Sequence, residues 1–65
     1  MFRNGDFIMN TMNMNHGIDK IFLVVKEYPS RSGTKFYDII NIKNKLIYIK
    51  VPLPEDFYVK LEKIF

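Results

Sequence analysis

The stretch KFYDIINIKNKLIYIKV (Lys35–Val51) decides the fold. Both of its halves are rich in β-branched and aromatic residues, which pack well on a pleated surface. The short polar connection between them contains Asn44, the residue there that best tolerates a left-handed backbone conformation. We therefore predict two antiparallel strands, Lys35–Ile42 and Leu46–Val51, that are joined by a tight turn centred on Asn44.

The register of this hairpin follows from its charged and apolar residues. A turn centred on Asn44 places Asp38 opposite Lys50, which pairs opposite charges across the strands. A slip of one residue in one strand would mix the two faces of the sheet. The other predicted pairs are Ile42 with Leu46, Ile40 with Tyr48, Asn41 with Ile47, Ile39 with Ile49, and Tyr37 with Val51.

The segment before this hairpin extends the sheet. Lys20–Tyr28 (KIFLVVKEY) has the composition of a strand, and Pro29–Thr34 contains the proline and glycine of a turn. Pro52 ends the last strand because it cannot donate a backbone hydrogen bond. The sequence thus predicts a three-stranded antiparallel meander.

The last segment, Pro54–Phe65, has the pattern of an amphipathic helix. Pro54 suits the first helical position, and the acidic residues that follow it complement the helix dipole. Phe57, Leu61 and Ile64 recur at helical spacing and form one apolar stripe. The expected fold class is therefore α+β, with a single β-β-β-α domain over residues 19–65.

Residues 1–18 differ in texture from the rest of the chain. They contain all four methionines and show no clean period of a helix or a strand. We expect a loosely ordered segment, with a short extra strand formed by Phe2, Phe7 and Ile8 as the alternative. The sequence also leaves open whether translation starts at Met1, Met9, Met12 or Met14.

Size and composition limit the classes of protein. The chain has 65 residues and no cysteine, which excludes disulfides and thiolate metal sites. A domain this small is marginally stable alone, so a partner subunit is the remaining source of stability. The longest apolar run, Ile21–Val25, is far shorter than the roughly 20 residues of a membrane span. Without a secretory signal, we expect a cytoplasmic protein.

The sequence offers little for catalysis. His16 is the only histidine, so a site with two histidine ligands cannot form, and Ser30 and Ser32 have no evident base. Asp38 is assigned to Lys50, and no second carboxylate is placed beside it. We therefore predict a protein without catalytic residues, metal or cofactor.

Both faces of the predicted sheet are apolar, and one helix covers only one of them. In an antiparallel sheet with one solvent-exposed face, apolar and polar residues normally alternate along each strand. The N-terminal segment, a second copy of the chain or a different protein must cover the second face, and we expect a homodimer. A composition that is rich in Ile, Asn and Lys and poor in Ala is what AT-rich codons produce, and short AT-rich genes are common in phages and in low-GC bacteria. On a phage origin, we expect a small inhibitor or modulator of a host defence protein in the host cytoplasm. The predicted interface residues are Phe36, Ile40, Ile42, Leu46 and Tyr48.

The alternative is a nucleic-acid-binding module. The formal charge is +3, and basic residues alternate with aromatic ones around the first hairpin, as in proteins that bind single strands. The stretch KEYPSRSGTKFY (26–37) resembles the β-hairpins of oligonucleotide-binding barrels, although such a barrel needs five strands. The candidate contact residues are Lys26, Arg31, Lys35, Lys50, Tyr28 and Tyr37.

Overall fold

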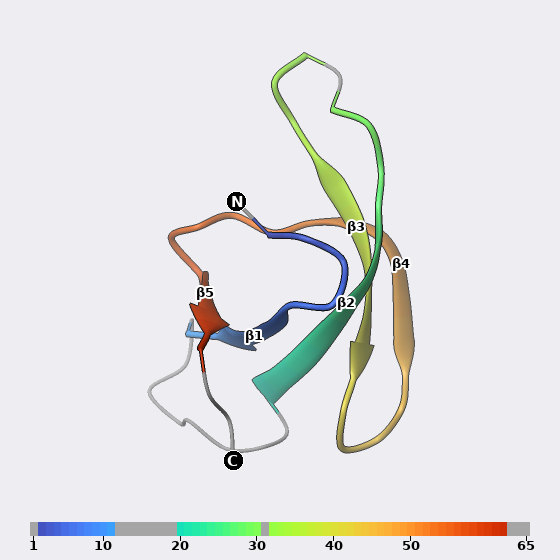
Figure 1. The fold of residues 1–65 in the computed structure, drawn as a ribbon, viewed down its shortest axis with the longest axis vertical. Helices are drawn as coiled ribbons and strands as arrows, with labels where there is room; N and C mark the ends of the chain where they lie inside the picture. Colours follow the sequence, from blue (N-terminus) through green and yellow to red (C-terminus); the bar gives the residue numbers. More distant parts are fainter. Residues whose placement is uncertain (1, 12–19, 31, 63–65) are drawn as a thin grey trace.

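The computed structural model describes residues 2–11, 20–30 and 32–62, which form one antiparallel sheet of five strands and no helix. The strands are β1 (Phe7–Asn10), β2 (Ile21–Glu27), β3 (Phe36–Asn41), β4 (Ile47–Pro52) and β5 (Tyr58–Leu61). They neighbour one another in the order β4-β3-β2-β1-β5, so β5 returns to pair with the first strand (Figure 1). The described chain is therefore all-β, and the predicted α+β class is wrong.

The predicted C-terminal helix is replaced by a turn and a strand. The backbone N–H groups of Phe57 and Tyr58 both donate to the Pro54 carbonyl, at 3.0 and 3.1 Å, so the helix-start signals produce only a single turn. The chain then becomes β5, which pairs with β1 from Asn10↔Tyr58 to Phe7↔Leu61. Tyr58 and Val59 favour a strand, and β1 offers the long-range partner that decides the outcome. Ile64 and Phe65 lie outside the described residues.

The N-terminal segment supplies a strand in the interior of the sheet. β1 lies between β2 and β5, and Ile8 at its centre is fully buried. Phe2 is also buried and meets the Tyr37 ring edge to face at a centroid distance of 6.1 Å. Of residues 1–18, positions 2–11 therefore belong to the sheet and the core, and the remainder is not described.

The register between β3 and β4 differs from the predicted one. Tyr37 pairs with Val51 as expected, but Ile39 pairs with Tyr48 and Ile40 with Ile47. The extra residue is accommodated in a bulge at Lys50, whose φ is 52° and whose backbone N–H donates to Asp38 Oδ1 at 2.7 Å. Asp38 thus binds the backbone of Lys50, and Ile47 and Tyr48 exchange faces.

The turn between β3 and β4 is organised by Asn41. Its buried side-chain oxygen accepts the backbone N–H groups of Lys43 and Asn44, at 2.8 and 3.0 Å. The left-handed residue of this turn is Lys45, with a φ of 65°, and not the predicted Asn44. Asn44 instead accepts the backbone N–H of Leu46 through its side chain at 2.9 Å.

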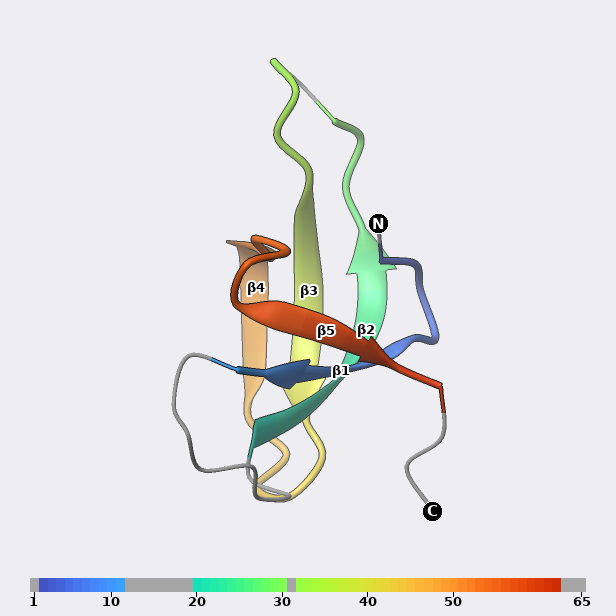
Figure 2. The same cartoon turned by 90° about the vertical axis from the view of Figure 1, so that its left-hand side faces the viewer.

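The sheet curls over itself, so that β1 and β5 cross β2, β3 and β4 (Figure 2). A second bulge, at Val25 between the pairs Val24↔Ile39 and Lys26↔Asp38, helps β2 to bend between its two neighbours. The space inside the curl is filled by apolar side chains. The core consists of Phe2, Ile8, Val24, Tyr37, Ile39 and Leu53.

Within the three described ranges, no helix is long and apolar enough to cross a lipid bilayer.

Candidate functional site

An apolar row crosses the face of the sheet that points away from the core. Side chains that are direct cross-strand partners share a face, and neighbours along a strand alternate between faces. Because Ile8, Val24 and Ile39 point into the core, their neighbours point outward. The outward partners run in register through all five strands, and we call them the outer row: Leu61, Phe7, Leu23, Ile40 and Ile47.

The outer row is accessible and is flanked by further apolar residues. Its first four members are half-buried, and Ile47 at the β4 end is 60% exposed. Beside it, Val59, Met9 and Ile21 form a second run of cross-strand partners on the same face. Neither run contains a charged residue, so the two runs form an apolar surface, which is bordered by the outward pair Lys26↔Asp38.

The residues predicted for a dimer or partner interface do not all lie together. Ile40 belongs to the outer row, and Leu46 is exposed just before β4. Tyr48 lies on the core side, where its ring meets Phe22 edge to face at 5.9 Å. Ile42 lies in the turn after β3, and its backbone N–H donates to the Ile21 carbonyl at 3.2 Å. Phe36 points outward at the opposite end of β3 from Ile40.

Sequence reasoning missed four members of the outer row, Leu61, Phe7, Leu23 and Ile47, and Leu61 was missed because it was assigned to a helix. Ile47 was placed on the wrong face because the bulge at Lys50 was not foreseen. Phe7 and Leu23 were missed because the pairing of β1 with β2 was not predicted. The alternation in Phe7–Asn10, with only Ile8 fully buried, was the available signal.

A second surface feature is a hollow of about 400 Å³ at the base of the β2–β3 hairpin, and we call it the basic hollow. Tyr28, Pro29, Phe36 and Lys50 line it. The Lys26 Nζ lies 4.7 Å from the centroid of the Tyr28 ring, and the Lys50 Nζ lies 5.7 Å from it. Two ammonium groups therefore surround one aromatic ring.

Asp38 contacts two of the residues that line this hollow, Tyr28 and Lys50. It hydrogen-bonds to the Tyr28 hydroxyl, which raises the pKa of Tyr28, and burial adds to the same effect. Because Asp38 also accepts the backbone N–H of Lys50, its carboxylate links Tyr28, just after β2, to Lys50 in β4.

The other residues predicted to contact nucleic acid lie elsewhere. Tyr37 is buried in the core, and the Lys35 Nζ lies 5.6 Å from its ring centroid. Lys35 also forms an ion pair with Glu27 at 2.6 Å, and this bond, together with one from the Asn4 backbone, lowers the pKa of Glu27. Of the predicted set, only Lys26, Tyr28 and Lys50 come together, while Arg31 lies outside the described residues.

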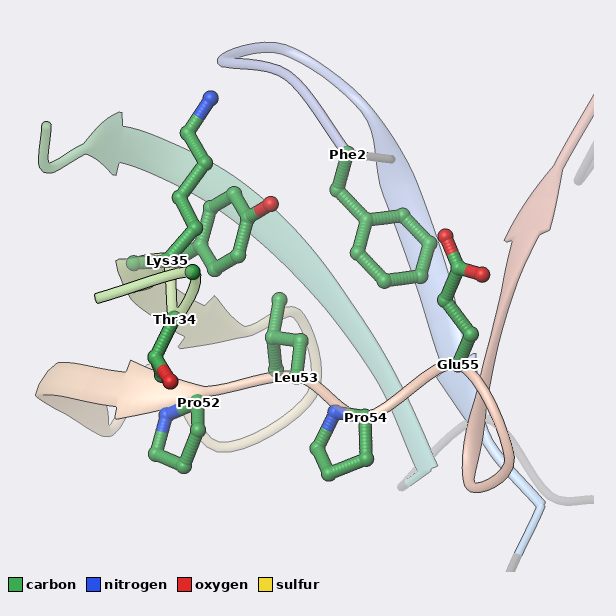
Figure 3. Close-up of a pocket in the computed structure, with 9 residues that line it drawn as sticks. Phe2, Thr34, Lys35, Pro52, Leu53, Pro54 and Glu55 are labelled. Atoms are coloured by element: carbon green, nitrogen blue, oxygen red, sulfur yellow. The ribbon is translucent and has the colours of Figure 1, made fainter. Parts of the chain in front are cut away.

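A second hollow, of about 300 Å³, opens beside the core. Figure 3 shows Phe2 on one side of it and Pro52, Leu53 and Pro54 along the other. Phe2 and Leu53 are themselves core residues, so this hollow borders the core of the curled sheet.

No three carboxylate, histidine or cysteine groups converge as metal ligands in the part of the chain that the structure describes. The Ser30 hydroxyl donates to the Thr34 carbonyl at 3.4 Å, and His16 lies outside the described ranges.

Comparison of the chain with models of protein families, with curated proteins and with solved structures finds no match. The residues that the structure describes form a curled sheet of five antiparallel strands with an apolar outer face.

Proposed function

We propose that this chain is a non-enzymatic protein-binding module that forms a homodimer through the outer row. The observation that carries the proposal is the register of five apolar partners across all five strands, on the face opposite the core. Exposed apolar surfaces of this kind commonly mark sites of protein association.

A second copy is the occupant that best fits this face. Two copies with a formal charge of +3 bring the fewest like charges together when they meet on an uncharged surface, and the outer row has no charged member. Pairing through the free edge of β4 is less favourable, because Lys50, Pro52 and the bulge interrupt that edge. Two faces stacked on each other avoid this obstacle.

Dimerisation would also add buried apolar surface to a protein with a small core. Only six apolar residues are buried among the described residues, and the sequence contains no cysteine. Covering the outer row removes further apolar surface from water, at about 25 cal/mol for each Å² buried. The second face thus supplies stability that one copy lacks.

The biological role that we propose is inhibition or modulation of a host defence protein by a small phage-type protein in the host cytoplasm. It rests on the AT-rich composition of the sequence and on association by surface contact rather than by chemistry. Such a protein acts by occupying a surface of its target.

Sedimentation velocity tests the dimer. From about 1 to about 200 micromolar, the wild-type chain should shift from monomer to dimer by mass action. Ile47→Lys places a charge at the most exposed position of the outer row and should hold the chain monomeric. Thr34→Lys adds the same charge at the exposed hairpin and should dimerise like the wild type.

A monomer throughout this range, with a melting temperature that is independent of concentration, would contradict the proposed function. Equal weakening by both substitutions would also count against it, because general charge repulsion would then explain the effect.

A further inference from the structure

The basic hollow has the properties of a ligand site that does not depend on the outer row. Figure 1 shows the hairpin between β2 and β3 (green) projecting beyond the rest of the sheet, and the hollow lies where this hairpin joins the strands. Its walls include the rings of Tyr28 and Phe36, which are both half-buried. A flat aromatic group can reach them from solvent.

The charge at this hollow is positive. The ammonium groups of Lys26 and Lys50 lie near the Tyr28 ring, and both side chains belong to exposed residues. Asp38 is the nearby acid and the cross-strand partner of Lys26, and it offsets one of these two positive charges, so the three groups leave a formal net charge of +1. Among the residues that the structure describes, no ion pair joins either ammonium group to a carboxylate, whereas Lys35 is paired with Glu27.

We propose that the basic hollow binds single-stranded nucleic acid, with bases stacked on Tyr28 and Phe36 and two neighbouring phosphates held by Lys26 and Lys50. Stacking on aromatic side chains and ion pairing with phosphates are the two contacts by which proteins hold single strands. The rings favour this ligand over an acidic peptide, for which the ammonium groups alone would suffice. The proposal goes beyond the proposed function and does not rest on it.

The test uses the full chain and a fluorescein-labelled oligothymidylate of about 12 nucleotides, a length within the site sizes of single-strand binders. Fluorescence anisotropy should show binding that weakens with salt, with a slope of log K against log salt of about −1.4 for two phosphate contacts. Tyr28→Ala and Phe36→Ala should each weaken binding by about 5- to 150-fold, the range for loss of one stacked base.

The charge contribution has a matched control. Lys26→Gln and Lys50→Gln should each weaken binding and make the salt slope shallower by about 0.7. Lys43→Gln removes the same charge from the turn at the other end of β3 and should leave the affinity and the salt slope unchanged. Tyr28→Phe keeps the ring and removes the hydroxyl that bonds to Asp38, so it should retain binding.

Three results would overturn the proposal. The first is equal weakening by Lys26→Gln and Lys43→Gln, which would indicate attraction by net charge alone. The second is unchanged binding by a folded Tyr28→Ala or Phe36→Ala variant, with folding checked by circular dichroism. The third is equally effective competition by a polyglutamate peptide of matched charge, which would assign the hollow to acidic peptides.

Discussion

Lys45 and Lys50 each adopt a left-handed backbone conformation, with φ values of 65° and 52°. This conformation costs a residue with a Cβ atom roughly 1–2 kcal/mol. Nearby side chains compensate, since Asn41 accepts two N–H groups of the turn and Asp38 accepts the N–H of Lys50. Two polar side chains of β3 thus determine how β4 begins and where it bulges.

Replacing Lys45 with glycine should therefore stabilise the protein. Glycine relieves the left-handed strain but gains freedom in the unfolded chain, so the net increase in the free energy of unfolding should be about 0.5–1 kcal/mol. Lys43→Gly, at a position without positive φ in the same turn, should instead lower it by about 0.5–1 kcal/mol. Urea denaturation of both variants checks the sign, and a loss of stability in Lys45→Gly would contradict the assigned turn.

Glu27 makes the stability of the fold depend on pH. The bond from Lys35 and that from the Asn4 backbone lower its pKa below the ordinary value of 4.5. The native state therefore favours the charged form, and its contribution is present above pH 4.5 and is lost as the pH falls through the lowered pKa. Glu27→Gln should be less stable than the wild type at neutral pH, and the difference should disappear in acid.

Denaturation at a series of pH values measures this difference. Glu62→Gln, an exposed substitution with the same change of charge, is the control. A Glu27→Gln variant as stable as the wild type at neutral pH would show that the bonds from Lys35 and Asn4 contribute nothing.

At the scale of elements, local sequence predicted β2, β3 and β4 to within two residues at their ends, because Val, Ile and Tyr dominate these strands. It failed for β5, because Phe57 and Leu61 have helical spacing and only the distant β1 decides between strand and helix. It failed for the β3–β4 register, because nothing marks Lys50 as a residue with positive φ. The first of these errors hid Leu61 as a member of the outer row, and the second hid Ile47. The grouping of Lys26, Tyr28 and Lys50, in contrast, could be predicted from the basic and aromatic residues of the sequence.

The role of β1 as an interior strand can be tested at Ile8. Ile8 is fully buried, so Ile8→Ala should lower the free energy of unfolding by about 2–5 kcal/mol, the range for large aliphatic side chains in cores. Val25→Ala, at the exposed bulge of β2, should cost about 0.5 kcal/mol or less. Thermal melts that show equal losses for the two variants would mean that β1 does not form part of the core.

At the scale of the whole molecule, the curl of the sheet separates two apolar surfaces. The inner one is closed by β1 and β5 crossing the other strands (Figure 2), and it forms the small core. The outer one carries the outer row from Leu61 to Ile47 and has no counterpart among the described residues. A second copy covers it in the proposed dimer.

The most direct test of this dimer is an isotope-filtered NOE experiment on a sample that mixes labelled and unlabelled chains. The proposal predicts contacts between copies from the methyl groups of Leu23, Ile40 and Ile47, including contacts to the Phe7 ring, because the outer rows stack on each other. Contacts between copies that involve only the edge of β4, or none at concentrations where the chain remains folded, would contradict it.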